Sequence, residues 1–383
     1  MAKNKGKTAS TVAETPTVSL HAADLRAVLP VLGALAGGKT PYVEVNIGSG
    51  GWQMRATDGS TWLTANGELA QEMGLSDAGV SVCISPAKLR EIVDRTKADT
   101  IELFAEESGK IVILAGSSHY TLSTVDPSVF PAPPSHEHVI STTVPGVALA
   151  DAIARTQFAC DVGSVRYALG GLHLQMTGGV LRVEATDTRR AARYAIAGVS
   201  GPDPDLAVVL PQHAARLAAR ILGGGDALVE MSPQQIRIKS GQWSMVSPPI
   251  DGRFPDMQGL IKGLGEAAKV ATSDASSLLS LCRQAAICTS EDSRGVDFVF
   301  GSDRIICRST APDVGESEVS LPCSMLAPYH QITVTLDAAY VVDYLKALAP
   351  AAEVTIEVRD ADSAIVLRSG PSWCLVMPMA SDR

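Results

Sequence analysis

The 383-residue chain is long enough for two or three domains, and its hydrophobic fraction of 46% supplies cores that must be mainly aliphatic, because only 4% of the residues are aromatic. The formal net charge of −9 excludes a protein that coats nucleic acid with its whole surface, but it allows a locally basic face. No apolar run is as long as a membrane span, and residues 1–16 lack the apolar segment of a signal peptide. We therefore expect a cytoplasmic protein with a disordered, Lys-bearing tail at residues 1–16.

The first motif along the chain is GALAGGKT at residues 33–40, which fits the phosphate-loop pattern of nucleotide hydrolases. That chemistry needs a loop that follows a strand and opens a helix, so that backbone N–H groups converge on phosphate. Here a helical pattern precedes the motif, and Pro41 and a strand pattern follow it. The order predicts a helix-to-strand turn, and it leaves a P-loop nucleotide hydrolase as the rival function.

Three copies of one pattern follow residue 17: strand, helix, hairpin, strand, helix, hairpin. The second halves of the copies lie at residues 80–131, 206–255 and 332–379, and their helices open at Pro86, Pro211 and Asp337. Pro211 follows Pro86 by 125 positions, and Asp337 follows Pro211 by 126. The first halves carry helical patterns at residues 24–32, 148–158 and 276–286. This period predicts three tandem α+β domains at residues 17–133, 134–262 and 263–383.

The clearest hairpin lies in the second copy. Apolar residues alternate with polar ones over residues 172–176 and again over residues 181–185, on either side of the turn Thr177-Gly178-Gly179. The hairpin ends in ATDTRR at residues 185–190, and ATD recurs in the first copy at residues 56–58. This stretch therefore predicts a sheet with one buried face and an unusual basic end.

Side chains for catalysis or metal binding are not grouped in the sequence. The seven cysteines are scattered within apolar patterns, so we interpret them as reduced core thiols, and the histidine pair His136 and His138 lies in a proline-rich linker. No serine lies in a G-x-S-x-G elbow. We therefore expect no cofactor and no metal, and we favour a binding scaffold over an enzyme.

Five motifs resemble the bacterial DNA polymerase III beta subunit family, the sliding clamps. They are VRYALGG at residues 165–171, ATDTRR at 185–190, DGRFPD at 251–256, SRGVDFVF at 293–300 and VMPM at 376–379. The resemblance implies a non-catalytic processivity factor for DNA replication, in which two chains associate head to tail into a ring of six domains around duplex DNA. An alternative is a clamp paralogue that serves a specialised polymerase or an accessory replicon.

The family also implies partners, which are the DNA polymerase III alpha subunit, the clamp loader delta subunit, and other polymerases and repair proteins with short clamp-binding motifs. These motifs bind a groove between the second and third domains, and Met residues suit a surface that accepts varied partners. The matching groove positions are Leu169, Thr186, Arg190, Pro255, Leu260, Tyr340, Leu375, Met377, Pro378 and Met379. Three features depart from the family: Met257-Gln258-Gly259 replaces basic residues, Arg189 replaces a histidine, and the chain end differs.

For DNA, the resemblance points to Lys39, Arg166 and Tyr167, and helix positions add Lys88, Arg216 and Arg220. Further basic candidates on the helices are Arg90, Arg95, Lys97, Arg155, Arg283 and Lys346. Mobile cations of this kind would contact phosphates without reading bases. For ring closure, Tyr120 and Leu122 match one side of the dimer interface, and Ile287 and Cys288 match the other. We expect a homodimer with an interface of about 1,600 Å² in total.

Overall fold

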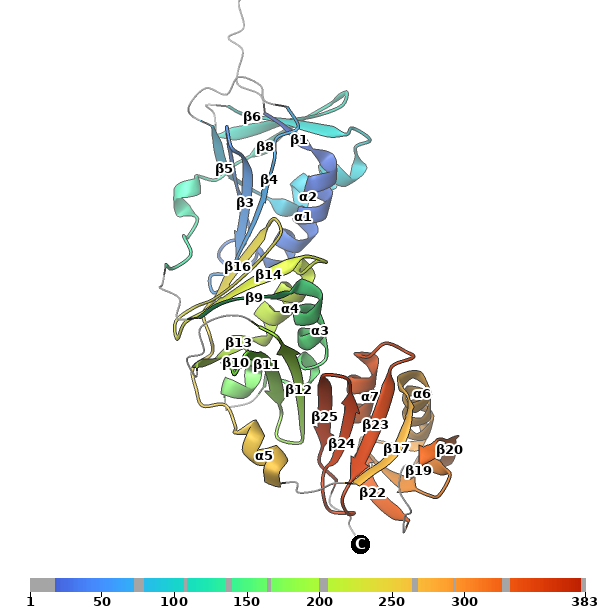
Figure 1. Ribbon diagram of the computed structural model, residues 1–383. Helices are drawn as coiled ribbons and strands as arrows, with labels where there is room; N and C mark the ends of the chain where they lie inside the picture. Colours follow the sequence, from blue (N-terminus) through green and yellow to red (C-terminus); the bar gives the residue numbers. More distant parts are fainter. Residues whose placement is uncertain are drawn as a thin grey trace, which may run out of the picture. The chain divides into compact units, whose positions relative to one another are not determined.

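The computed structural model describes residues 18–71, 79–106, 109–135, 140–163, 167–199, 206–263, 268–291, 294–325 and 331–379. The chain forms two compact units, one of residues 1–134 with 242–245 and the other of residues 135–241 with 246–383 (Figure 1). The predicted tail at residues 1–16 lies outside the described residues.

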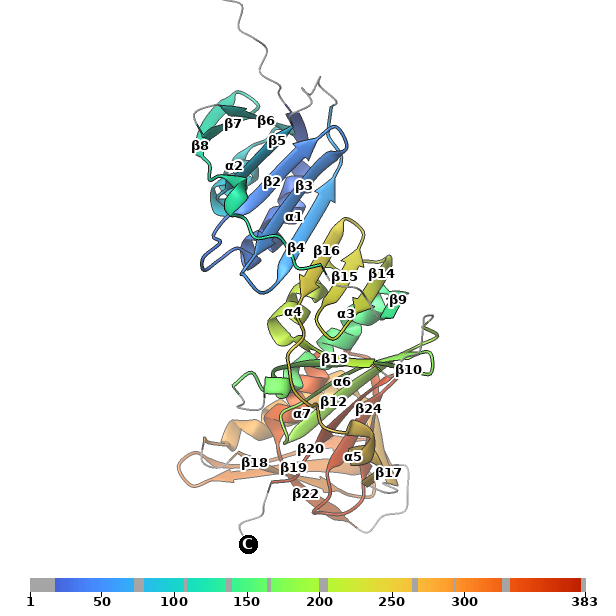
Figure 2. The same cartoon turned by 90° about the vertical axis from the view of Figure 1, so that its left-hand side faces the viewer.

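The first copy of the repeat, in the first unit, consists of two helices and two antiparallel groups of strands. The strands pair in the orders β1-β6-β7-β8 and β5-β2-β3-β4. Figure 2 looks onto the second group, with α1 behind it. The elements are β1 Val18–His21, α1 Ala22–Leu35, β2 Val43–Gly48, β3 Gly51–Thr57, β4 Trp62–Gly67, β5 Val80–Ile84, α2 Pro86–Arg95, β6 Thr100–Glu106, β7 Lys110–Ala115, β8 Ser118–Ser123 and η1 Pro127–Val129.

The second copy follows the same order of elements. Its helices α3 and α4 pack against each other, as α1 and α2 do in the first copy. The elements are β9 Ile140–Pro145, α3 Gly146–Ala154, η2 Gln157–Ala159, η3 Tyr167–Gly170, β10 Gly171–Thr177, β11 Val180–Thr186, β12 Arg190–Ala197, β13 Leu206–Pro211, α4 Gln212–Ile221, β14 Asp226–Met231, β15 Ile236–Ser240, β16 Trp243–Ser247 and α5 Met257–Gly263.

The third copy repeats the order again, with one short extra strand. Its main core lies between the helix pair α6 and α7 and the strands beneath them, and it includes the fully buried Phe300 and Tyr344. The elements are β17 Ala268–Asp274, α6 Ala275–Ala285, η4 Ala286–Cys288, β18 Gly295–Phe300, β19 Arg304–Ala311, β20 Gly315–Pro322, β21 Ser324–Met325, β22 Ile332–Asp337, α7 Ala338–Lys346, β23 Glu353–Val358, β24 Ile365–Ser369 and β25 Ser372–Val376.

The three copies confirm the predicted α+β class, but each predicted hairpin is a meander of three strands. The missed strands in the second copy are β12 and β16. In β12 the alternation is hidden, because small alanines share the strand with two arginines, Arg190 and Arg193. The limits proposed for the three domains remain predictions.

Local signals explain the elements that the sequence predicts correctly. Gly178 and Gly179 form the two-residue turn between β10 and β11, and both have positive φ angles, as this hairpin turn requires. Asp337 caps α7, since its carboxylate accepts a hydrogen bond from the backbone N–H of Ala339 at 2.9 Å. In α1 the buried Leu25, Val28 and Leu32 recur at helical spacing.

The phosphate-loop pattern at residues 33–40 has the wrong geometry for phosphate. Gly33 lies inside α1, and the chain then turns at residues 37–40, where the Thr40 N–H donates to the Gly37 carbonyl at 3.0 Å. Strand β2 follows at Val43. The motif therefore ends a helix and leads into a strand, as its sequence context predicts, and the hydrolase reading has no structural support.

Candidate functional site

The second and third copies share one nine-stranded sheet, because β12 pairs with β25 (Figure 1). Ala191 lies opposite Leu375, and Arg193 lies opposite Trp373. One apolar cluster spans this seam; its buried members are Leu169, Ala191, Val209, Phe254, Met257, Ala364, Val366, Trp373 and Leu375. Leu169 and Leu375, both predicted to line a groove, are each only 2% exposed. They therefore form part of the core beneath this surface.

The segment 250–261 crosses the seam cluster, and we call it the strap. Phe254 and Met257 are buried in the cluster, and the Phe254 ring stacks on His173 with 4.5 Å between ring centroids. Pro255 is exposed, and Leu260 is 41% exposed. The strap thus covers part of the seam and presents Leu260 to solvent.

A rigid turn at residues 187–190 joins β11 to β12. The Asp187 carboxylate accepts hydrogen bonds from the backbone N–H groups of Arg189 and Arg190 at 3.0 and 2.8 Å. Thr186, another predicted groove residue, donates its hydroxyl to the Arg190 carbonyl at 2.7 Å and accepts the Thr188 N–H at 3.1 Å. Thr188 has a φ of 74°, and it is the only residue other than glycine with a positive φ among the described ranges. The turn therefore holds the two arginines in fixed and different directions.

Arg190 points into the seam and is largely buried. Its guanidinium donates to the Asp187 carboxylate at 2.9 Å, to the Asp343 carboxylate at 2.8 Å and to the Phe158 carbonyl at 2.6 Å. The Tyr340 ring centroid lies 4.6 Å from the same group. Burial opposes the charge of Arg190, but Asp343 and Asp187 outweigh this effect and raise its pKa. Arg190 therefore joins the second copy to the third, and its donors are occupied.

The segment Met377-Pro378-Met379 leaves β25 and is held at both ends by its backbone. The Met377 N–H donates to the Arg189 carbonyl at 2.8 Å, and the Met379 N–H donates to the Thr335 carbonyl at 2.9 Å. Their side chains are 41% and 39% exposed. Both methionine side chains are therefore exposed, and their role in lining a groove stays a prediction.

The candidate DNA-binding side chains differ in their availability. Lys39, Lys88, Arg216 and Arg220 are exposed, whereas Arg166 and the side chain of Tyr167 lie outside the described residues. Arg155, a further candidate, is less available: its side chain is 16% exposed, and it donates to Ser372 at 3.4 Å across the seam. Its guanidinium also lies near Asp151 and over the Tyr194 ring, so it is engaged within the second copy as well as across the seam.

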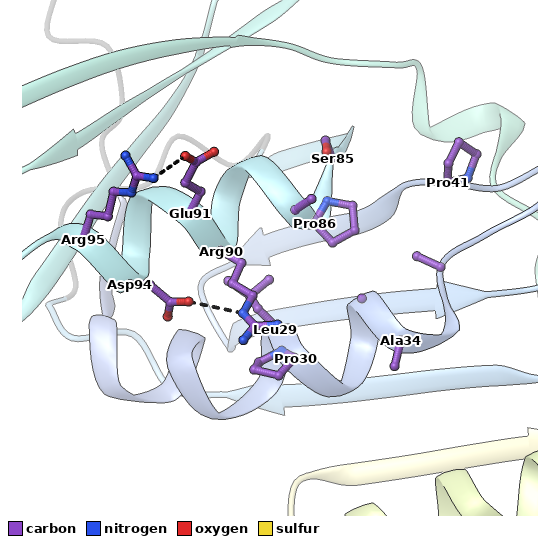
Figure 3. Close-up of a pocket in the computed structure, with 13 residues that line it drawn as sticks. Leu29, Pro30, Ala34, Pro41, Ser85, Pro86, Arg90, Glu91, Asp94 and Arg95 are labelled. Carbon is purple, nitrogen blue, oxygen red and sulfur yellow. Dashed lines mark hydrogen bonds and ion pairs between the residues drawn. The ribbon is translucent and has the colours of Figure 1, made fainter.

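The three cations of α2 are partly offset by two acids on the same helix. Arg90 pairs with Asp94 at 3.2 Å, Arg95 pairs with Glu91 at 2.9 Å, and Lys88 lies 3.4 Å from Glu91. Figure 3 shows the two arginine pairs beside a cavity of about 740 Å³ between α1 and α2. This face of α2 is nearly neutral, so it is less basic than the sequence analysis expects.

Two strands at sheet ends carry the predicted dimer contacts. Strand β8 ends its sheet; Tyr120 on it is 37% exposed and Leu122 is partly buried. Strand β20 ends the sheet β20-β19-β18-β22, and the short helix η4 packs against it. Within η4, Ile287 is 70% exposed and Cys288 is partly buried. Each side of the predicted interface thus combines an open strand with exposed apolar side chains.

Sequence reasoning missed the partners that fix Arg190, namely Asp187, Phe158 and Asp343. Asp187 could have been found, because an aspartate two and three positions before the arginines is typical of a side-chain-bonded turn. Within the described ranges, no helix is long and apolar enough to cross a membrane. Over the same ranges, no group of three or more His, Cys, Asp or Glu side chains could hold a metal ion.

Comparisons with known proteins agree with this architecture. The family model for the central domain of the DNA polymerase III beta subunit matches residues 143–256. The Beta sliding clamp of Pseudomonas aeruginosa is 25% identical over 319 residues, which cover 82% of this chain and 86% of that protein. The Beta sliding clamp of Escherichia coli K12 is 27% identical over 278 residues, which cover 71% of this chain and 74% of that protein.

The fold matches over almost the full chain. The crystal structure of a Pseudomonas aeruginosa sliding clamp bound to griselimycin gives a TM-score of 0.87 at 22% identity, covering 96% of this chain and all of that one (100%). The matched central domain contains the hairpin, the turn at residues 187–190 and the four basic candidates of the second copy. On these grounds residues 143–256 match the central domain of the DNA polymerase III beta subunit, and the whole chain is similar in sequence and fold to the bacterial sliding clamps.

Proposed function

We propose that this chain is a DNA polymerase processivity factor that associates with a second, identical chain to form a closed ring around duplex DNA. The observation that carries this proposal is the position of its exposed apolar side chains. Among the described residues nine large hydrophobic side chains are exposed, and five of them lie at the predicted dimer contacts or the predicted groove. They are Tyr120 and Ile287 at the sheet ends, and Leu260, Met377 and Met379 at the seam.

Ring closure would pair β8 of one chain with β20 of the other chain. An unpaired edge strand is a template for another strand, and proteins usually cover or pair such edges. Strand β8 is exposed on both faces over most of its length, so backbone pairing and side-chain contact would both be gained. Because the same contact forms twice around a twofold axis, two chains give a closed ring of six domains.

The dimer is tested by sedimentation of the purified chain and of Ile287→Asp. We expect the parent chain to be dimeric at micromolar concentration, and the variant to dissociate at least tenfold more readily, because it places a charge in an apolar contact. Val147→Asp is the matched control, since Val147 is 56% exposed on α3, which is not among the elements predicted to form the interface. A monomeric parent chain would contradict the ring. Equal dissociation constants for the Ile287→Asp and Val147→Asp dimers would show that Ile287 does not lie in the interface.

Inside the ring, contact with DNA would be weak and independent of base sequence. Exposed cations that meet phosphates through water give a salt-sensitive attraction without a fixed register, which permits sliding. The residues proposed for this role are Lys39, Lys88, Arg166, Tyr167, Arg216 and Arg220. Retention on DNA would depend on closure of the ring, so the neutral face of α2 is compatible with this function.

Partner proteins would bind at the seam, where Met377, Met379 and Leu260 would form the exposed apolar part of the groove and the predicted residues Leu169 and Leu375 would support it from beneath. The partners implied are the DNA polymerase III alpha subunit, the clamp loader delta subunit, and other polymerases and repair proteins. Because its substrate would be chromosomal DNA, the ring would be located in the cytoplasm, at the nucleoid. The test is primer extension on a long single-primed circle with the polymerase and its loader. The chain should lengthen the products of each binding event, and unchanged product lengths would refute the proposal.

A further inference from the structure

The carbonyl of Ala285, at the junction of α6 and η4, lies against two serine hydroxyls from neighbouring strands. Ser309 on β19 donates to this carbonyl at 2.7 Å. The Ser317 hydroxyl on β20 lies 3.1 Å from the same carbonyl and 2.9 Å from the Ser309 hydroxyl, so its single proton can be donated to either oxygen. Ser309 and Ser317 lie directly opposite each other in the sheet, and Ser309 is only 4% exposed. We call these two side chains the serine pair.

The other two copies use the corresponding strand differently. In the repeat, β19 corresponds to β3 and β11, which end in Thr57 and Thr186. The Thr57 hydroxyl donates to the Thr61 carbonyl, and the Thr186 hydroxyl donates to the Arg190 carbonyl, both at 2.7 Å. Each of these hydroxyls therefore closes the turn that follows its own strand. Ser309 instead reaches a helix, and it does so in the copy that carries η4.

The serine pair connects the two parts of one side of the predicted ring contact. Ser317 belongs to β20, the end strand of its sheet, and η4 begins directly after Ala285. The short helix packs against both β19 and β20. At its other end, the Thr289 hydroxyl donates to the Ala286 carbonyl at 2.8 Å. Ile287, which is 70% exposed, is therefore presented by a short turn whose backbone is held on both sides.

We propose that the serine pair positions the surface that closes the ring, because it fixes η4 to the edge strand β20 before the second chain arrives. This inference rests on the proposed dimer, and it adds Ser309 and Ser317 as positioning residues that need not touch the second chain. A surface that is ordered before association loses less conformational entropy when it binds. Without the pair, η4 would be ordered only during ring closure, and the dimer would dissociate more readily.

The test is sedimentation of Ser309→Ala, Ser317→Ala and the double variant. Because either serine alone can still donate to the carbonyl, each single variant should raise the dimer dissociation constant by less than about twofold. The double variant should raise it by about fivefold to tenfold, which is the ratio given by one lost hydrogen bond. Ser309→Ala combined with Ser317→Thr keeps one hydroxyl and should behave like Ser309→Ala. The control is Ser280→Ala, since Ser280 is exposed on α6 and its hydroxyl accepts a hydrogen bond from Gln284 on the same helix.

Hydrogen exchange separates positioning from a general loss of stability. It is measured in a Tyr120→Asp background, which disrupts the opposite side of the predicted contact and leaves η4 unchanged. The double variant should exchange the amides of residues 287–289 about threefold faster, while the amides of residues 278–282 in α6 keep their rates. Circular dichroism shows whether the double variant is folded at the assay temperature.

Two results would overturn the inference: an unchanged dissociation constant in the folded double variant, or unchanged exchange at residues 287–289. If the double variant does not fold, Thr289→Val releases the other end of η4 and should also weaken the dimer; an unchanged constant would then overturn the inference. A parent chain that is monomeric at every concentration would contradict the ring itself. A dimer that responds to Ile287→Asp but not to loss of the serine pair would contradict only the positioning role.

Discussion

Replacing Thr188 by glycine should stabilise the protein, and the reciprocal change at Gly59 should destabilise it. Both residues hold the same place in the repeated turn, ATDTRR in the second copy and ATDGST in the first. In each turn the threonine hydroxyl and the aspartate carboxylate accept the same pattern of backbone N–H groups. Both positions have positive φ, 94° at Gly59 and 74° at Thr188. The sequence thus offers an internal matched pair.

The magnitude follows from the backbone alone. A left-handed conformation costs an L-residue about 1–2 kcal/mol, and the greater freedom of glycine in the unfolded chain offsets about 0.5–1 kcal/mol of this. Thr188 is exposed and loses no packing when truncated, and an added Cβ at Gly59 would have no heavy atom within 4 Å. We expect Thr188→Gly to raise the free energy of unfolding by roughly 0.5–1 kcal/mol, and Gly59→Thr to lower it by a similar amount.

The assay is guanidinium denaturation of both variants, with hydrogen exchange of the β11 and β12 amides as a local measure. Exchange should slow in Thr188→Gly, because the turn that joins these strands opens less often. Two compact units can unfold in separate steps, so each variant is compared with the parent chain within one transition. A lower midpoint for Thr188→Gly would refute the strain argument and would mean that Thr188 makes a stabilising contact.

Three further predictions concern the seam, a helix cap and the thiols. Arg190→Gln should lower the free energy of unfolding by about 2–3 kcal/mol, because it leaves Asp187 and Asp343 without their shared cation. The control Arg308→Gln breaks the exposed pair with Glu318 and should lower the free energy of unfolding by less than about 1 kcal/mol. Equal effects of the two variants would contradict a role of Arg190 in stabilising the seam. Hydrogen bonds from Ser276 and Ser277 lower the pKa of Asp274 to about 2, so Asp274→Ala should destabilise the protein at pH 7. This difference should be fully present above about pH 4 and fade as pH falls toward 2 in acid titrations; a pH-independent difference would contradict it. Burial raises the pKa of Cys83 to about 11 and of Cys282 to about 12, so iodoacetamide at pH 8 should modify neither thiol until the chain is denatured. Cys288 should react when the chain is diluted to monomers and should be protected in the dimer. Peptide mass spectrometry of the alkylated protein measures both effects.

Much of the fold could be predicted because local signals and the repeat agree. The hairpin of β10 and β11 follows from alternation and from two adjacent glycines, and the helix starts follow from Ser85-Pro86 and Asp337. Strand β12 could not be predicted in this way. Its alternation is carried by alanines beside Arg190 and Arg193, whose burial depends on partners that come from other parts of the chain.

The candidate site shows the same limit. Met377 and Met379 could be predicted as exposed, because their apolar Met-Pro-Met segment lies outside the strand and helix pattern of the third copy. The role of Arg190 could not, since its partner Asp343 lies 153 positions away. The near-neutral face of α2 was accessible to sequence reasoning, because Glu91 lies three and four positions from Lys88 and Arg95.

The most direct test of the ring is retention on circular and on linear duplex DNA of equal length. The purified chain is loaded by a clamp loader, and salt is then raised to screen its contacts with phosphate. A closed ring predicts retention on the circle and loss from the ends of the linear molecule. Equal loss from both would show that binding is only electrostatic, and it would contradict the clamp mechanism while leaving the threefold repeat intact.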